Sequence, residues 1–494
     1  MSLASLYTIC LDRIYRFLKE GVWKFGVLNP FSDLPTRAVD NLMEFTQSRG
    51  EDPPIIADVI LLLISGRLTR LDLSPFHLLA EQESIVSSIQ TGGDISLQNF
   101  LSHCDKPVIS YLVGDIISLN PYLEELHLNI YPGFDVIRKC QNLRILRLYR
   151  SFGMLWDDYV PIDLSVLSCL RNLEVLYVPN MDIDAIANVL DVCPKLISIG
   201  LNDSLDSLEE TAHRRLKNSL LNCAVGTHFQ LRRCVWGKHL RIEDPHEKSA
   251  YKSRFCDKMR FAVTLCPLIQ ELIFQVHAKD AIKELRALKQ LTLLRIDFIV
   301  CEDDFVPDFV ALLQEIGPQI KHLSVLSNRR VPVDVICDCC LHLQSFEIDG
   351  PTVVNDSSNA SGNFPLKRLK LYSLYEEVDK ESLLFLLSNC MYLEELFLDD
   401  AEIVDDTLLN QIFERNPLRE LKVSCIEYCD ITREGFQMFM KKAASIQTVL
   451  ITSDEGKYVY DVKSLFKDPN LRCLKGIDVR RREFFDCRLS PKRF

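Results

Sequence analysis

The 494-residue sequence is poor in the residues that most catalytic motifs require. It contains only 18 glycines and 10 histidines. It has no Gly-rich phosphate loop, no His-Glu-x-x-His pair and no Gly-x-Ser-x-Gly turn. Carboxylates are abundant but fall mainly between strand leucines, as in Glu124-Glu125 and Glu394-Glu395, where a solvated face is the simpler interpretation. We therefore expect a protein that is not an enzyme and needs no cofactor.

Long hydrophobic runs and an excess of positive charge are also missing. Charged residues interrupt the first 28 residues, which excludes a secretory signal. The most apolar window, Ile55–Ile64, contains Asp58 and is too short to cross a bilayer. The net charge of −12 argues against nucleic acid as a partner. These absences predict a cytoplasmic or nuclear protein with reduced thiols and no membrane association.

What the sequence does have is a repeat. The pattern apolar, two variable, apolar, variable, apolar recurs at an average interval of about 26 residues from Ile269 onward, a period typical of leucine-rich repeats. Its fourteen units start at Leu68, Leu123, Leu143, Leu173, Leu196, Ile269, Leu291, Ile320, Leu343, Leu366, Leu393, Leu418, Ile446 and Leu474.

Each unit predicts a short strand followed by a helix. The last two apolar residues of a unit lie two apart and share one side of a strand. Segments such as Asp406–Phe413 and Gly435–Met440 have helical period. Since one unit cannot bury its apolar face alone, we expect a stack. The predicted fold class is α/β: a curved leucine-rich-repeat solenoid over residues 51–480, with a parallel concave sheet and a short all-α N-terminal module over residues 1–50.

Three segments depart from this regularity. Residues 202–260 carry many basic side chains and are either degenerate repeats, which an unbroken core favours, or an inserted binding element. Residues 349–365 are rich in Gly, Ser and Asn and predict a mobile loop. Residues 481–494 form a basic C-terminal tail, which is either a solvated end, the favoured interpretation, or a weak localisation signal.

Eighteen cysteines require an explanation in a reducing compartment. Five of them lie three residues before the first apolar residue of a unit, which predicts buried thiols at the corner between helix and strand: Cys140, Cys193, Cys266, Cys340 and Cys390. Metal binding is the alternative for the clusters around Cys337 and Cys234. Structural thiols are the favoured interpretation of both clusters, and we expect no metal site.

The repeats resemble a known family at this point. The Cys-x-x-Leu-x-x-Leu-x-Leu strand, followed by turns such as Ile403–Leu408 and Ile431–Phe436, is similar to the cysteine-containing leucine-rich repeats of F-box and related ubiquitin-ligase substrate receptors. The resemblance covers residues 68 to 480. It is specific for fold and only suggestive of function, because function depends on sites carried by a fold.

The first 50 residues carry two short motifs. Leu6, Cys10 and Ile14 match the elongin-binding box of cullin-ligase receptors and form one apolar stripe on a helix. A second segment resembles a von Hippel–Lindau-type cullin-binding box through Leu34, Pro35, Ala38 and Leu42, although Ala38 is smaller than that family usually has. The resemblance implies an elongin B/C-type adaptor and a cullin as partners.

Three alternatives remain open for this segment. Leu34 to Phe45 also resembles the start of an F-box, which would recruit Skp1, but no Cys-x-x-Trp-like end follows. The first helix is alternatively a cap over the first repeat. A scaffold that binds proteins without any ligase is the third alternative.

A receptor of this kind would hold a protein substrate on the predicted concave face. Strand alternation places mixed basic, acidic and aromatic residues there, and exposed Tyr, Phe and Arg are typical anchors of protein interfaces. The predicted substrate-binding residues are Arg147, Tyr149, Tyr177, Arg295, Arg368, Lys370, Tyr372 and Phe397.

Overall fold

The computed structural model describes twelve stretches of the chain: residues 6–23, 28–48, 59–73, 106–128, 134–149, 167–219, 228–237, 245–355, 363–372, 379–399, 401–453 and 472–473. The chain divides into two compact units. The first comprises residues 1–202 and 210–223, and the second comprises residues 203–209 and 224–494.

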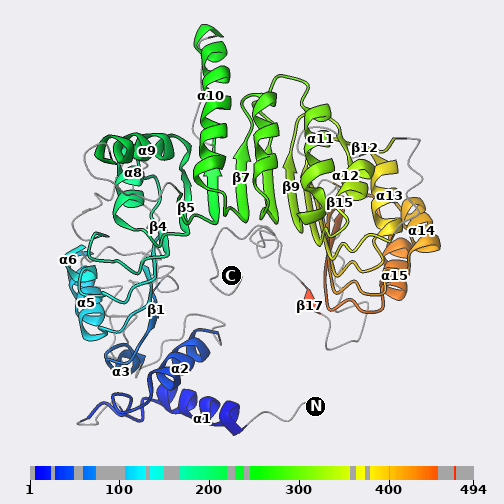
Figure 1. Ribbon diagram of the computed structural model, residues 1–494. Helices are drawn as coiled ribbons and strands as arrows, with labels where there is room; N and C mark the ends of the chain where they lie inside the picture. Colours follow the sequence, from blue (N-terminus) through cyan, green and yellow to red (C-terminus); the bar gives the residue numbers. More distant parts are fainter. Residues whose placement is uncertain are drawn as a thin grey trace. The chain divides into compact units, whose positions relative to one another are not determined.

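The first unit combines helices with a parallel sheet (Figure 1). Its strands pair in chain order: β1 (Arg70–Asp72), β2 (Glu125–Leu128), β3 (Ile145–Leu148), β4 (Val175–Tyr177) and β5 (Ser198–Asp203). Its helices are α1 (Leu6–Glu20), α2 (Thr36–Ser48), α3 (Val59–Leu63), α5 (Lys106–Leu119), α6 (Phe134–Ile137), α8 (Ile183–Val192) and the greater part of α9 (Leu205–Ser219).

The second unit repeats the same strand and helix alternation. Its parallel sheet runs in the order β6 (Arg233–Trp236), β7 (Glu271–Gln275), β8 (Leu293–Asp297), β9 (His322–Leu326), β11 (Ser345–Asp349), β13 (Arg368–Tyr372), β14 (Glu395–Asp399), β15 (Val423–Cys429), β16 (Thr448–Ser453) and β17 (Arg472–Cys473). The helical segments are α10 (Pro245–Leu265), η3 (Lys279–Ala287), α11 (Val306–Ile316), η4 (Gly317–Gln319), α12 (Val333–Cys339), α13 (Lys380–Asn389), α14 (Asp406–Arg415) and α15 (Arg433–Lys442).

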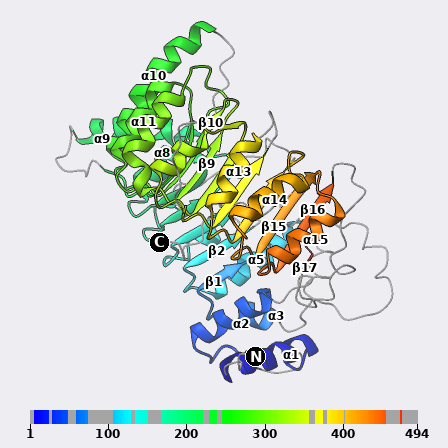
Figure 2. The ribbon, with the colours of Figure 1, turned by 90° about the vertical axis from the view of Figure 1, so that its right-hand side faces the viewer.

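Rows of apolar side chains explain why these strands stack. In register across the sheet, Leu294, Leu323, Phe346, Leu369 and Leu396 are at most 1% exposed. Helices α11 to α15 lie along one side of these strands (Figures 1 and 2). Each fully buried leucine contributes about 1.5–3 kcal/mol relative to an exposed one. The mixed α/β architecture with long parallel sheets, expected from the repeat pattern, is therefore confirmed.

Helix starts follow from the turns that precede them. Asp405 accepts a hydrogen bond from the Leu408 backbone N–H at 2.7 Å, and Thr432 Oγ1 accepts one from Gly435 N–H at 3.2 Å. These are ordinary N-caps, which satisfy donors that the helix leaves free. Asp406 also accepts from the Thr432 N–H and hydroxyl, at 2.9 and 2.5 Å. A Cβ at Gly435 would collide with that carboxylate, so the link between neighbouring repeats needs glycine there.

Two predicted units are wrong in register. Strand β15 pairs Val423 with Glu395 and Ser424 with Leu396, so its unit starts at Leu421 and not at Leu418. Leu418 instead has a φ of +48° and lies in the turn that leads to the strand. Strand β17 pairs Cys473 with Val449, whereas a unit that starts at Leu474 would pair Ile477 with Val449. Both errors arose because Ser424 and Cys473 stand where the pattern expects leucine.

The irregular segments contain more structure than their composition indicates. Residues 202–260 include β6, whose Cys234 and Trp236 pair with Leu272 and Phe274, so at least one degenerate repeat unit lies there. The mobile loop predicted over residues 349–365 is wrong for Thr352–Val353, which forms strand β12 and pairs with β10 (Val331–Pro332). Residues 356–362 and the basic tail lie outside the described residues.

The N-terminal helices do not form a separate body. Helices α1, α2 and α3 belong to the same compact unit as strands β1 to β5. A short all-α module over residues 1–50 is therefore not shown. Among the described helices, none combines the length and the apolar composition needed to cross a bilayer.

The recurring cysteines occupy the corners predicted for them. All five are at most 3% exposed, and Cys193, Cys340 and Cys390 are the residues at which α8, α12 and α13 end. Burial raises the pKa of Cys140 and of Cys193 to about 11, and that of Cys340 to about 12. These thiols therefore stay protonated at neutral pH and behave as small apolar side chains.

Asparagine replaces cysteine at one of these corners. Asn416 ends α14 and is 1% exposed. Its Nδ2 donates to the carbonyls of Leu387 (2.7 Å) and Cys390 (3.1 Å), and its Oδ1 accepts from the Leu418 N–H (3.0 Å). One buried amide thus ties two consecutive repeats together.

Thiol labelling tests the assignment of the corner cysteines. At pH 7.5, N-ethylmaleimide is expected to modify the exposed Cys10 quickly and to leave Cys140, Cys193 and Cys340 unmodified until the chain unfolds. Because burial lifts their pKa above the ordinary 9.0, their contribution to stability is complete below about pH 9 and declines as the pH rises towards 11. Mass spectrometry of digested samples measures the modification. Equal labelling rates for Cys10 and the corner thiols would contradict this assignment.

Replacement of the corner asparagine tests the tie between repeats. Asn416→Ala removes three buried hydrogen bonds, to the carbonyls of Leu387 and Cys390 and from the Leu418 N–H, and should lower the free energy of unfolding by about 2–4 kcal/mol. Asn410→Ala, on the exposed side of the same helix, is the control and should change it by less than about 0.5 kcal/mol. Urea denaturation followed by circular dichroism measures both. Equal effects of the two substitutions would refute the structural role of Asn416.

Candidate protein-interaction sites

Helix α1 presents apolar side chains to solvent over its first half. Leu6 is 77% exposed, Ile9 is 54% exposed and Cys10 is exposed, whereas Ile14 is half-buried and Leu18 is fully buried. In the stripe predicted for adaptor binding, Leu6 and Cys10 are therefore exposed to solvent, whereas Ile14 is partly covered by the rest of the chain. A helix that served only as a cap would bury the stripe along its whole length.

Contacts between α1 and α2 hold α1 in place at its first turn and at its middle. The Tyr15 and Phe45 rings meet edge to face at 5.9 Å, and Asn41 Nδ2 donates to the Tyr7 hydroxyl at 2.6 Å. Beyond α1, the Trp23 ring lies 5.3 Å from the Phe31 ring, which is buried. These contacts fix the direction of the exposed end of the helix without covering it.

The predicted cullin-contacting residues divide into accessible and inaccessible ones. Pro35 is exposed, and Leu34 and Ala38 are half-buried. Pro35 begins the first turn, where its carbonyl accepts from the Ala38 N–H at 2.8 Å. Leu42, however, is 2% exposed and belongs to the core of the first unit, together with Val39 and Met43. A partner that leaves the chain folded cannot reach Leu42.

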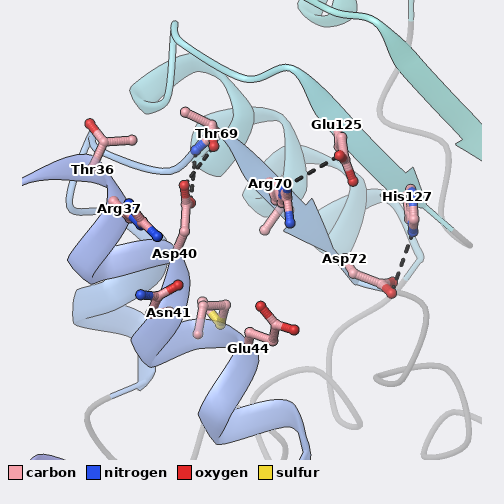
Figure 3. Close-up of a pocket in the computed structure, with 12 residues that line it drawn as sticks. Thr36, Arg37, Asp40, Asn41, Glu44, Thr69, Arg70, Asp72, Glu125 and His127 are labelled. Atoms are coloured by element: carbon pink, nitrogen blue, oxygen red, sulfur yellow. Dashed lines mark hydrogen bonds and ion pairs between the residues drawn. The ribbon is translucent and has the colours of Figure 1, made fainter. Parts of the chain in front are cut away.

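A polar pocket that the sequence did not predict lies between α2 and strands β1 and β2. Its volume is about 630 Å³ (Figure 3). Asp40 accepts hydrogen bonds from Thr69 N–H (3.0 Å) and from the Thr69 hydroxyl (2.5 Å), which anchors α2 to the start of β1. Arg70 Nε pairs with Glu125 Oε1 at 3.3 Å. Both contacts join residues far apart in the sequence, and no local motif signals them.

The pocket is lined mainly by polar side chains. They include carboxylates, the two arginines Arg37 and Arg70, and the threonines Thr36 and Thr69 (Figure 3). In the described part of the chain, no cluster of three or more His, Cys, Asp or Glu side chains has the geometry to hold a metal ion. What the arrangement does is fix helix α2 against the first repeat.

The face of the sheet opposite the leucines carries the predicted substrate-binding residues. Strand register aligns Arg295, Ser324, Glu347, Lys370 and Phe397 in one row of the second unit. A parallel row contains Asp297, Asp349, Tyr372 and Asp399. The structure therefore brings Arg295, Arg368, Lys370, Tyr372 and Phe397 onto one face, as strand alternation predicted. Arg147, Tyr149 and Tyr177 share the corresponding face of the first unit.

Exposure of these residues differs from the prediction. Arg147, Lys370 and Phe397 are only 6%, 5% and 3% exposed, so their expected role as exposed anchors is wrong. Phe397 packs in an apolar cluster with Leu293, Cys425 and Leu450. The half-buried anchors are Tyr149, Tyr177, Arg295, Arg368 and Tyr372. Alternation along a strand predicts on which face of the sheet a side chain lies, but it does not predict how deeply that side chain is buried.

Burial also changes the electrostatics of this face. Lys370 Nζ lies 4.6 Å from the centre of the Tyr372 ring, a cation–π contact in a desolvated position. Burial raises the pKa of the Tyr372 hydroxyl, and nearby Glu347 and Asp399 raise it further. Burial likewise raises the pKa of the Asp349 carboxyl. Tyr372 therefore keeps its proton at neutral pH and remains available as a hydrogen-bond donor.

Comparison with known proteins adds little to this picture. The chain matches no protein-family model and no curated protein. Among solved structures it is similar to a protein of Bacteroides fragilis, with 12% sequence identity, a TM-score of 0.27, and coverage of 51% of this chain and 84% of that one.

Substitution of two leucines separates the accessible from the inaccessible motif residues. Leu42→Ala should lower the free energy of unfolding by about 2–5 kcal/mol because it empties part of a packed core. Leu6→Ala, at a position 77% exposed, should change it by less than about 0.5 kcal/mol. Thermal and urea denaturation of the full chain compare the two. A large loss of stability with Leu6→Ala would show that the N-terminal half of α1 is packed in solution.

Proposed function

We propose that this chain is the substrate-recognition subunit of a cullin-type ubiquitin ligase. It binds an elongin B/C-type adaptor through the exposed half of α1 and a cullin through the start of α2. It holds a protein substrate on the polar face of its repeat sheet. The observation that carries the proposal is the exposure of Leu6 and Cys10 on a helix whose Leu18 is buried.

The geometry of α1 suits insertion into a partner's groove. An amphipathic helix binds a groove through residues spaced three or four apart, and Leu6 and Cys10 meet this spacing at the free end of the helix. Ile14, half-buried at the boundary, would line the edge of such a contact. Cys10 is small enough to allow close approach of the partner.

The cullin contact proposed for α2 uses fewer residues than the sequence motif contains. Since Leu42 is in the core, only Leu34, Pro35 and Ala38 remain for a partner. Pro35 and the first turn of α2 would provide the contact. The N-terminal exposed stripe of α1 carries most of the binding in this proposal.

The chain itself supplies no chemistry in this function. It brings a bound substrate close to a ubiquitin-charged enzyme held by other subunits, which raises the effective concentration of one for the other. The row of charged and aromatic residues on the sheet face, with half-buried Arg295, Arg368 and Tyr372, suits recognition of a protein surface or peptide.

Two other candidates share part of the same evidence. An F-box/leucine-rich-repeat protein would recruit Skp1 through the segment that starts at Leu34-Pro35, with the same biochemical role. A scaffold without ligase activity would use the sheet face alone. The F-box alternative differs from the main proposal in its adaptor, Skp1, and the scaffold differs in having no adaptor.

A double substitution on α1 tests the proposal directly. Leu6→Ser with Cys10→Asp removes two exposed apolar contacts and should weaken elongin B/C binding by about 2–4 kcal/mol, roughly 30-fold or more in Kd. The fold should be unaffected because both residues are exposed. Lys19→Ser, on the opposite side of the helix, is the control and should bind as the unmodified chain does. Isothermal titration of the full chain with purified elongin B/C measures the three affinities.

Recovery of partners from cells distinguishes the alternatives. Co-purification of elongin B/C and a cullin supports the proposal. Co-purification of Skp1 would replace it with the F-box alternative, and recovery of neither adaptor would leave the scaffold.

A further inference from the structure

The sheet face of the first unit contains a buried arginine, Arg147, two of whose nitrogens have no hydrogen-bond partner among the described residues. Arg147, in the middle of β3, is 6% exposed. Its Nε and Nη2 atoms are buried and make no hydrogen bond within the described part of the chain. A guanidinium cannot lose its proton under ordinary conditions, and a buried charge without a counter-charge is costly. The position of Arg147 therefore calls for a negatively charged group.

Two carboxylates on the neighbouring strands β1 and β2 already have partners of their own. Glu125 Oε1 lies 3.3 Å from Arg70 Nε, and Asp72 Oδ2 lies 3.4 Å from His127 Nδ1. Arg144, three residues before Arg147, shows what a paired arginine looks like here: its Nη2 lies 2.8 Å from Glu174 Oε2. Arg147 differs from Arg144 because its Nε and Nη2 atoms have no hydrogen-bond partner among the described residues.

Three rings frame Arg147. Strand register places His127 on one side of it and Tyr177 on the other. The Tyr149 ring lies 6.3 Å from the His127 ring and 5.6 Å from the Tyr177 ring, so it spans the gap in which Arg147 stands. His127 Nε2 is a second buried nitrogen for which the described residues provide no partner.

We propose that Arg147 binds a carboxylate of a peptide segment in a protein partner. Nε and Nη2 form the side edge of the guanidinium, whose two parallel N–H groups match the two oxygens of a carboxylate. The half-buried Tyr149 and Tyr177 rings contact the residue that carries the carboxylate. The site rests on the proposed function in one respect, namely that the sheet face receives a protein.

The surroundings favour a carboxylate over a phosphate. Glu125 lies on β2, next to β3, and Asp72 lies on β1, one strand further. Their negative charge opposes a dianion more strongly than a monoanion. The two buried nitrogens of Arg147 that lack a partner among the described residues, Nε and Nη2, suit two coplanar oxygens better than the three of a phosphate. The carboxylate comes either from an Asp or Glu side chain or from a chain terminus.

A peptide-retention experiment on the immobilised full chain tests the site. Four sets of fluorescent random heptapeptides are used: with a free C-terminal carboxylate only, with Asp or Glu side chains only, with both, and with neither. Retention should require a carboxylate, and the set that is retained identifies its source. Arg147→Leu should lower retention at least tenfold, and Arg147→Lys should also weaken it, because an ammonium cannot make the side-on pair. Arg144→Leu, the control in the same segment, should retain peptides as the unmodified chain does.

Two results would overturn the site. One is that Arg147→Leu and the unmodified chain retain the same peptides, or that peptides without any carboxylate are retained equally well. The other comes from thermal unfolding: removing an unpaired buried charge should leave Tm unchanged or raise it, so a clear fall in Tm with Arg147→Leu would show that the guanidinium is paired inside the chain.

Failure of the site and failure of the proposed function give different outcomes. If Arg147→Leu has no effect on peptides while elongin B/C still binds α1, the site is wrong and the ligase role stands. If carboxylate peptides bind through Arg147 but no adaptor is recovered, the site stands and the chain is a scaffold.

Discussion

The inability of a single strand and helix to bury its own apolar face governs this structure. Each strand presents leucines or their equivalents to one side, and these are covered only when the next strand and the next helix are in place. The rows through Leu294, Leu323 and Leu369 are fully buried for this reason. Corner thiols, N-cap aspartates and the amide of Asn416 then secure junctions that the leucine rows have already brought together.

The same constraint leaves the opposite face of the strands free for other residue types. Charged, aromatic and apolar side chains alternate there without breaking the stack, because the backbone hydrogen bonds and the leucine rows supply the stability. Function is thus free to vary on one face while the other face stays fixed. The depth at which Arg147 and Lys370 lie shows that this face is more than a solvated surface.

Much of the fold was predictable from periodicity, and the reason is local. A strand with leucines two residues apart can be recognised within ten residues of sequence. So can a helix that starts at an Asp or Thr cap, as at Asp405 and Thr432. The register of β15 was not predictable, because Ser424 occupies a leucine position and Leu418 belongs to a turn. Strand β6 was hidden in the same way by Cys234 and Trp236.

The candidate sites were predictable only in part. Spacing placed Leu6 and Cys10 on one stripe, but whether that stripe is covered depends on α2, which meets it through Tyr15 and Phe45 from thirty residues away. Burial of Leu42 has the same origin. The unpaired nitrogens of Arg147 could not be predicted from the sequence. They depend on the ion pairs that Glu125 and Asp72 form with Arg70 and His127 in the folded chain.

The bond between Asp40 and Thr69 has a consequence for the length of the stack. Strand β1 is the first strand of the first sheet, and a parallel strand at an edge offers free backbone groups to any further strand, including one from another molecule. By accepting from the Thr69 N–H and hydroxyl, Asp40 sets helix α2 beside the start of β1. Helix α2 therefore stands next to the first strand, where a further strand would have to pair.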